Sequence, residues 1–204
     1  MKRFWMLGLC AAMAAGCTTP PSEDATRREA EQVFGKSFTH GNQQMLARVQ
    51  TQDEVQALCS RYRNDPPKDV AGRIEKSQAA TVQYPGKLMG DWRQGEKIAQ
   101  DGFGLRFTDT RQPNRPNGGN CYACHRLAPQ ELSFGTLGPS LYQFGRQRGS
   151  GEAMQRYVYA KIYNSEAFKA CSGMPRLGYN HVLTPEQITH LVALLLDPES
   201  PVNR

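Results

Sequence analysis

Five consecutive residues carry the clearest chemistry in this 204-residue sequence, the pentapeptide Cys121-Tyr122-Ala123-Cys124-His125. The spacing C-x-x-C-H is the attachment signature of c-type haem. Cysteines three residues apart lie on neighbouring positions of one helical turn, so both sulfurs can form thioethers with the vinyl groups of one porphyrin. The adjacent histidine then reaches the iron as its proximal ligand. The sequence therefore predicts one covalently attached haem c.

Other sites that use a C-x-x-C pair fit this sequence less well. A thioredoxin-like redox pair lies in a βαβ pattern, and a zinc site needs a second pair of cysteines or histidines. Neither accompanies Cys121 and Cys124. The formal net charge is +6, without the Lys/Arg clusters of a nucleic-acid-binding protein. We therefore expect no nucleic acid as partner. No G-x-S-x-G motif or hydrolytic triad is apparent either, so we expect no catalytic residues in this chain.

The N-terminus has the pattern of an export signal. Lys2 and Arg3 form a basic region, and Phe4 to Ala15 form an apolar stretch too short to span a bilayer. Small residues then precede Cys17, as in a bacterial lipobox, where the cysteine is acylated. Ordinary signal cleavage without acylation is the alternative. We predict a signal peptide over residues 1–16, a periplasmic location, and membrane anchoring through a lipidated Cys17.

The remaining cysteines suggest a disulfide. Cys10 leaves with the signal peptide, Cys17 is the predicted lipidation site, and two cysteines belong to the haem motif. Cys59 and Cys171 remain in an oxidising compartment, where a bond between them is the simplest pairing. The alternatives are two buried thiols or a bond to a partner chain.

Several patterns predict helices that would position these residues. Thr51-x-x-Glu54 has the spacing of a capping box, and it precedes an apolar stripe that includes Val55 and Cys59. A short charged helix pattern lies between Asp24 and Phe34, with mostly solvated side chains.

The second half of the chain has stronger helix signals. Asp91 is a good N-cap for a helix in which Gly95 would allow another helix to approach closely. Helical spacing also runs from Met154 to Ile162. Thr184-Pro185-Glu186-Gln187 combines an N-cap, a proline at the first helical position and a glutamine that completes a capping box.

This order of motifs over residues 85–204 resembles the class I cytochrome c fold. More specifically, it resembles the small X subunits of thiosulfate-oxidising (Sox) cytochrome complexes. The stretches that carry the resemblance are Gly90-Asp91-Trp92-x-x-Gly95-Glu96, Gly118 to His125, Gly135 to Leu141, Met174 to Gly178, and Asp197-Pro198-x-x-Pro201-Val202-Asn203. The resemblance implies an all-α monohaem domain over 85–204. From the polar and helical patterns that precede it, we expect a tether and helical extension over 17–84.

Candidates for the second iron ligand are Met89, Met154, Met174, His40, His181 and His190. Met154 lies in a helical pattern typical of core residues, His190 on the expected polar side of the last helix, and Met89 before the first helix. Met174 precedes a proline that stiffens its loop, and it matches the ligand position of the family. We therefore predict a His125/Met174 pair, with His181 as the alternative.

The resemblance also assigns a role to Pro139. In class I cytochromes the carbonyl of a proline shortly after the motif holds the proximal histidine, and Pro139 matches that position. The alternative is a simple turn proline.

The function implied by the resemblance is electron transfer. We expect a non-catalytic subunit that forms a heterodimer with a larger, haem-containing A subunit of a Sox complex. It would accept electrons during the thiosulfotransferase reaction and pass them to a soluble acceptor. One alternative is a free-standing electron carrier to a terminal oxidase. Another is a haem protein with an open sixth position for a gas or peroxide, which the Met174 assignment disfavours.

Overall fold

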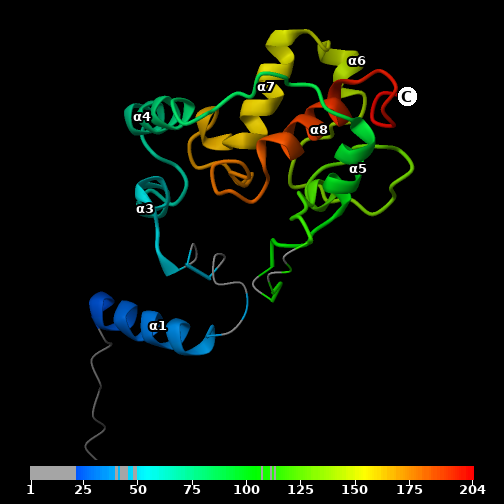
Figure 1. Cartoon of the computed structure of the whole chain (residues 1–204). Coiled ribbons are helices and arrows are strands. Elements are labelled where there is room, and N and C mark those ends of the chain that lie inside the picture. The colour runs from blue at the N-terminus through cyan, green and yellow to red at the C-terminus, as the bar shows by residue number, and fades with distance from the viewer. Residues whose placement is uncertain are drawn as a thin grey trace, which may run out of the picture. The chain divides into compact units, whose positions relative to one another are not determined.

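A computed structural model describes residues 22–39, 41, 46–47, 50–106, 108–110, 112 and 114–204 (Figure 1). All regular secondary structure among these residues is helical, which confirms the predicted all-α class. The chain divides into two compact units, residues 1–37 and 38–204, so the predicted extension 17–84 is divided between them. The predicted signal peptide, Cys17 and His40 lie outside the described residues.

The described part of the first unit is one helix, α1, Glu23–Ser37. It has no buried residue, as the charged sequence pattern predicts. Acidic residues in its first turn and Lys36 in its last turn complement the helix dipole. Within the described ranges of the whole chain, no helix is long and apolar enough to cross a membrane.

Helices α3, Glu54–Arg61, and α4, Lys68–Ala79, follow in the second unit. The predicted capping box Thr51/Glu54 is wrong, because the N-cap of α3 is Asp53. Its side chain accepts from the backbone N–H of Gln56, and the Gln56 side chain accepts in return from the backbone N–H of Asp53. The apolar stripe is as predicted, with Val55 and Cys59 buried.

The larger core is built around the contact between α5, Trp92–Gln100, and α8, Pro185–Leu196. Asp91 caps α5, and Thr184 caps α8 with the predicted capping box. A Cβ atom on Gly95 would lie 2.2 Å from the carbonyl oxygen of His190, so only glycine permits the approach of the two helices. The close helix contact expected at Gly95 is therefore present.

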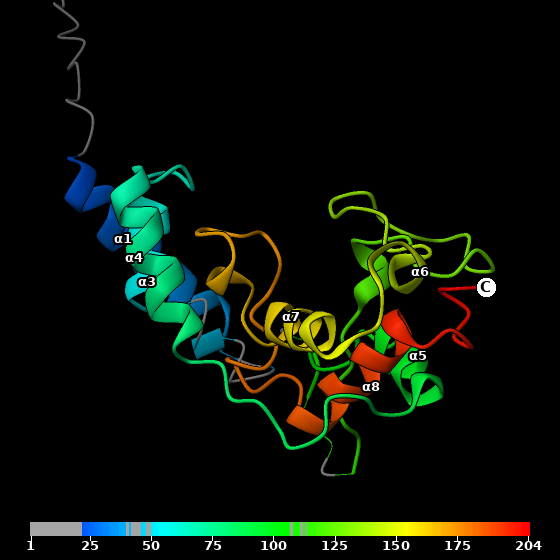
Figure 2. The ribbon, with the colours of Figure 1, turned by 90° about the horizontal axis from the view of Figure 1, so that it is seen from above.

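Between these helices the chain forms α6, Phe144–Arg148, and α7, Glu152–Tyr163. Figures 1 and 2 both show α7 between the α3–α4 pair and α8. After α8, the side chain of Asn203 accepts from the backbone N–H groups of Gly145 and Arg146 and donates to the carbonyls of Leu195 and Asp197. The C-terminus thereby joins α6 to the end of α8.

Candidate functional site

The Cys-x-x-Cys-His motif forms a single 3₁₀ turn, Cys121–Ala123, that continues into Cys124 and His125. Backbone N–H groups of Cys124 and His125 both donate to the carbonyl of Cys121, which brings the two cysteines together on one turn. Both are half-buried and neither forms a disulfide. Burial raises the pKa of the Cys121 thiol to about 12.

His125 is held by the loop that follows the motif. Its Nδ1 atom lies 2.7 Å from the carbonyl oxygen of Pro139. A carbonyl can only accept, so Nδ1 carries the proton and Nε2 has the free lone pair. The carbonyl of Pro139 thus makes the predicted contact with His125. Gly138 lies against the ring, since a Cβ atom there would be 2.2 Å from Cε1 of His125.

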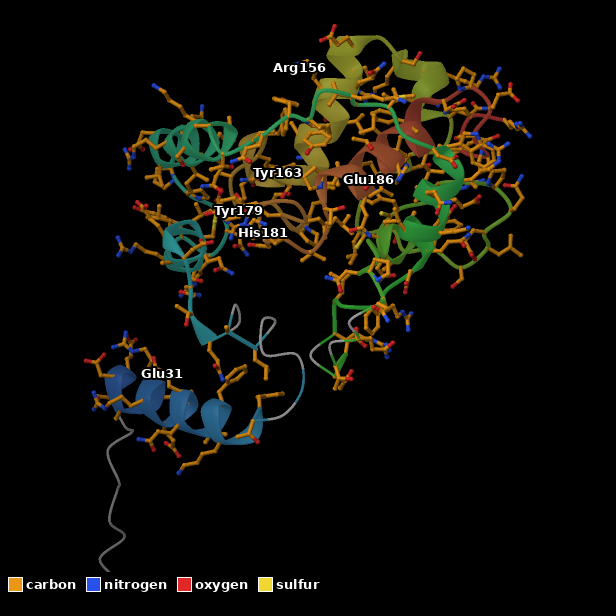
Figure 3. The ribbon with its side chains drawn as sticks, in the orientation of Figure 1. Glu31, Arg156, Tyr163, Tyr179, His181 and Glu186 are labelled. Carbon is orange, nitrogen blue, oxygen red and sulfur yellow. A yellow bond between two sulfur atoms is a disulfide. The ribbon has the colours of Figure 1, made fainter. Side chains whose placement is uncertain are left out.

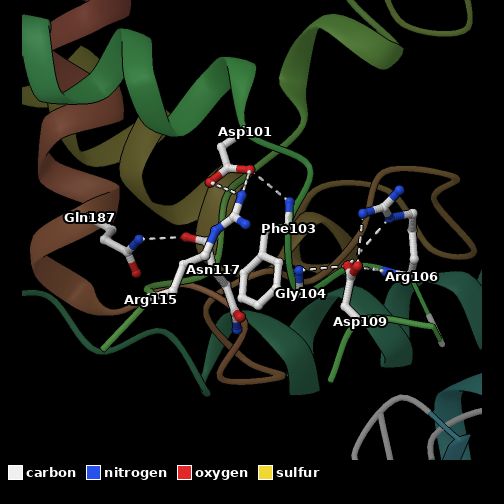
Figure 4. A network of polar contacts seen from close by, with 8 residues as sticks. All are labelled: Asp101, Phe103, Gly104, Arg106, Asp109, Arg115, Asn117 and Gln187. Carbon is white, nitrogen blue, oxygen red and sulfur yellow. Dashed lines mark hydrogen bonds and ion pairs between the residues drawn. The ribbon is translucent and has the colours of Figure 1, made fainter. Parts of the chain in front are cut away.

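The loop that leads into the motif is fixed by two polar clusters (Figure 4). Arg115 binds the carboxylate of Asp101 at 3.3 Å, and its guanidinium covers the Phe103 ring at 4.0 Å. Asn117 donates to the carbonyl of Val182, while Gln187 of α8 donates to the carbonyl of Asn117. These bonds tie the start of the motif to the N-terminal end of α8.

The second cluster of Figure 4 is centred on the carboxylate of Asp109. Burial acts to raise its pKa, but hydrogen bonds from the side chain and backbone of Arg106 and from the backbone of Gly104 outweigh burial. The pKa of Asp109 is therefore below its usual value. The carboxylate stays ionised at neutral pH and keeps its hydrogen bonds from Gly104 and Arg106.

Met174 lies in the segment of residues 164–184 between α7 and α8, here called the Met174 loop. Its backbone is bonded on both sides: the buried Ser165 hydroxyl donates to its carbonyl at 2.5 Å, and its N–H donates to the Ser172 hydroxyl at 3.2 Å. The Met174 side chain is half-buried and packs against the same core cluster as Cys121. No local pattern in the sequence predicts the roles of these two serines.

The other candidate ligands are placed differently. Met154 packs against the core from α7, as expected. Met89, which precedes α5, also packs against this core. The Nδ1 atom of His190 accepts from the backbone N–H of Asp91 at 2.8 Å, which engages this histidine at the α5–α8 contact.

His181 is exposed and lines a cavity of about 200 Å³, together with Gln83, Tyr163, Gly178, Leu183, Thr184 and Pro185. Figure 3 shows His181 and Tyr179 on the Met174 loop, with Tyr163 on α7. Met174 does not line this cavity. The cavity borders the motif through Leu183, whose Cδ1 atom would lie 3.6 Å from a Cβ atom on Gly119, two residues before Cys121.

A disulfide joins Cys59 of α3 to Cys171 of the Met174 loop, with a Cα–Cα distance of 5.4 Å. The two residues pack in a second, smaller core cluster with Val55, Val70, Ile74 and Ala170. The pairing expected from the compartment argument is therefore the one that the structure contains. Helix α3 is covalently connected to the segment three residues before Met174.

Tyr159 is a fully buried polar residue of α7 in the larger core cluster. The Tyr159 hydroxyl is buried and has no hydrogen-bond partner among the described residues. The Tyr159 ring stacks on Tyr163 with the ring centroids 6.0 Å apart. Burial raises the pKa of Tyr159 to about 12, so the hydroxyl is a neutral donor at neutral pH. A donor of this kind is available to an acceptor brought in by a bound group.

The donor set suits a covalent haem. Two thiols on one turn can form thioethers, and the tautomer fixed by Pro139 leaves Nε2 of His125 available to iron. Gly138 leaves the imidazole room that a side chain would fill. Among the described residues no group of three or more His, Cys, Asp or Glu side chains could hold a bare metal ion.

None of the established protein-family profiles matches the chain. Among curated proteins, it is 34% identical over 195 residues to an uncharacterized lipoprotein of Aquifex aeolicus. The alignment covers 91% of each protein. This similarity extends over nearly the whole chain, including the segment that precedes the Cys-x-x-Cys-His motif.

Proposed function

Because this chain belongs to the same family as the Aquifex aeolicus lipoprotein, we propose that it is an exported, lipid-anchored, monohaem c-type cytochrome. The relative's name supports the lipoprotein part of the proposal, and the Cys17 lipobox pattern agrees with it. After cleavage Cys17 would be the acylated N-terminus, with the folded part held at the periplasmic face of a membrane.

The observation that carries the haem assignment is the fixed tautomer of His125. Nδ1 donates to the Pro139 carbonyl, so Nε2 would be the atom available to hold iron. Cys121 and Cys124 would hold the porphyrin through thioethers, and Met174 would supply the second axial ligand. When bound, the haem supplies one-electron redox chemistry at a potential that a His/Met pair raises.

The class I cytochrome c fold is part of the same proposal. It is supported by the crossing of α5 and α8 at Gly95, by the motif that follows α5, and by a methionine loop directly before α8. In this fold the chain's own residues bind, orient and enclose the cofactor. We propose a non-catalytic role, which is what the resemblance to the X subunits implies.

The partner we propose is the larger, haem-containing A subunit of a thiosulfate-oxidising complex, with a soluble protein as the onward electron acceptor. The support is the resemblance of the motifs around Gly90, Gly118, Gly135 and Met174 to the X subunits of such complexes. On this proposal the chain receives electrons from the catalytic subunit.

Haem attachment is tested on the exported protein after denaturation and acid-acetone extraction. We expect one haem per wild-type chain to stay with the polypeptide and none to stay with a Cys121→Ala/Cys124→Ala variant. Met174→Ala should keep the haem, lose the weak red methionine–iron band and bind added cyanide. Haem that resists extraction in the double variant would refute the attachment site. Copurification of a larger haem subunit separates the Sox-type complex from a free-standing carrier.

A further inference from the structure

We infer that Arg176 is a positioning residue for Met174, through which the α3–α4 segment (residues 53–81) clamps the Met174 loop. The inference rests on the proposed function, because it concerns how the second iron ligand is held. It gives the N-terminal extension a role that the haem motif does not require.

Arg176 lies two residues after Met174 and is buried, with 7% of its surface exposed. Its guanidinium binds two residues of the α3–α4 segment: Nη2 lies 2.5 Å from Oδ2 of Asp53, and Nη1 lies 3.3 Å from Oε1 of Gln78. The guanidinium also covers the Tyr179 ring at 4.7 Å. A planar, always-charged fork can bind two acceptors with separate nitrogens while it stacks on a ring, whereas an ammonium group has a single nitrogen and no planar face.

The acceptors are themselves held in place. Asp53 uses its other carboxylate oxygen to cap α3. Gln78 accepts through the same Oε1 atom from the side chain of Asn164, which is fully buried at the start of the Met174 loop. The guanidinium therefore joins a helix cap, a helix end and the loop in one network.

The α3–α4 segment also holds the loop before Met174. Cys59 is bonded to Cys171, and the carboxylate of Glu75 accepts from the backbone N–H of Ala170 at 3.1 Å. The segment thus grips the loop at residues 170–171 and again at Arg176. Met174 lies between these two points, with its backbone bonded to Ser165 and Ser172.

The contact between Arg176 and the α3–α4 segment depends on the charge of the guanidinium. A buried guanidinium that loses its carboxylate partner is strongly disfavoured, so breaking the pair favours conformations of the Met174 loop in which Arg176 reaches solvent. Asp53 is about one-third exposed, which moderates the effect. We expect the open state of the loop to become roughly tenfold more populated when the pair is broken.

The test uses four variants of the exported protein. Asp53→Asn keeps an N-cap residue of equal quality but removes the carboxylate that binds Arg176. Arg176→Met removes the charge and keeps an extended side chain, and Arg176→Lys keeps the charge without the fork. The matched control is Asp69→Asn, which makes the same charge change in the first turn of α4, where the exposed Asp69 forms an ion pair with the exposed Arg73.

Amide hydrogen exchange of residues 171–177 and cyanide binding to the ferric protein are measured for each variant. We expect both to be about tenfold faster in Asp53→Asn and Arg176→Met, intermediate in Arg176→Lys, and unchanged in Asp69→Asn. The methionine–iron band and the reduction potential should fall in the same order. If Arg176→Met does not fold, Asp53→Asn decides, since its cap remains.

The outcomes separate the two proposals. Haem-loaded variants with wild-type exchange and cyanide binding would overturn the clamp and leave the proposed function intact. Equal effects in Asp69→Asn and Asp53→Asn would also overturn it, because general charge loss would then be the cause. Absence of covalent haem from the wild-type protein would overturn both.

Discussion

Gly138 lies in contact with the imidazole of His125: a Cβ atom at Gly138 would be 2.2 Å from Cε1 and 2.8 Å from Nε2 of the ring. The carbonyl of the neighbouring Pro139 holds the same ring through Nδ1. Two consecutive residues therefore determine both the tautomer and the position of the proposed proximal ligand.

Gly138→Ala should displace the His125 ring. The added methyl group has no room, so either the ring or the loop must move, at a cost of about 1–3 kcal/mol in the free energy of unfolding. We expect a weakened low-spin absorption spectrum in the haem-loaded variant. Gly86→Ala is the control, because a Cβ atom there meets nothing within 4 Å. Identical spectra and stabilities for the two variants would contradict the contact.

Asn203→Ala should destabilise the junction of α6 and α8. The side chain makes four hydrogen bonds to backbone groups there, and its removal leaves buried donors and acceptors unpaired. We expect a loss of about 2–4 kcal/mol, measured by denaturant unfolding. Glu199→Ala, which removes an exposed ion pair with Arg204, should change stability by less than about 0.5 kcal/mol. A loss no greater than that of the control would be the contrary result.

Glu166→Gln should stabilise the protein at neutral pH. Burial raises the pKa of Glu166, although the backbone N–H of Cys171 and the charge of Arg176 act in the opposite direction. The folded carboxyl therefore keeps its proton to higher pH than the unfolded chain does, and stability falls as pH rises through the folded pKa. Glutamine can still accept from Cys171 and lacks this loss.

The expected pH profile of that variant has a definite sign. Its advantage over wild type should be present at neutral pH and vanish below the ordinary glutamate range, where both chains are neutral at this position. Unfolding free energies across this range provide the measurement. Glu152→Gln serves as control, because it makes the same substitution at an exposed position of α7. An advantage that grows toward acid pH would reverse our assignment.

Reduction of the disulfide should loosen the Met174 loop before the rest of residues 85–204 unfolds. The bond closes a sequence separation of 112 residues, which corresponds to up to about 4–5 kcal/mol in the chain-entropy model. We expect the methionine–iron band to be lost at lower temperature after reduction. Mass spectrometry of the denatured, unreduced protein provides the direct check. Alkylatable thiols at Cys59 and Cys171 would rule the bond out.

The sequence was sufficient where a signal is local. Asp91 and the Thr184–Gln187 box begin their helices as predicted, because each cap bonds only within its own first turn. At α3 two overlapping patterns compete, Thr51/Glu54 and Asp53/Gln56. The second prevails, and its Asp53 also binds Arg176, 123 residues further along the chain. No local pattern contains that information.

The parts of the candidate site likewise differ in how local their signals are. The motif and its proline lie within 20 residues, and their spacing is visible in the sequence. Arg176, Asp53 and Gln78 support Met174 through contacts between distant segments, and Ser165 supports it from within the same loop. The residue types of all four are ordinary for surface or cap positions. Only the folded chain identifies them.

The Cys59–Cys171 bond also determines the covalent topology of the chain. It closes a ring that contains both Cys121 and Cys124. In an oxidising compartment all four thiols compete, and this pairing leaves the two motif cysteines reduced and together on one turn. We expect the fold to sort its own thiols in this way before thioether formation. A protease cut anywhere inside the ring would leave the two fragments joined.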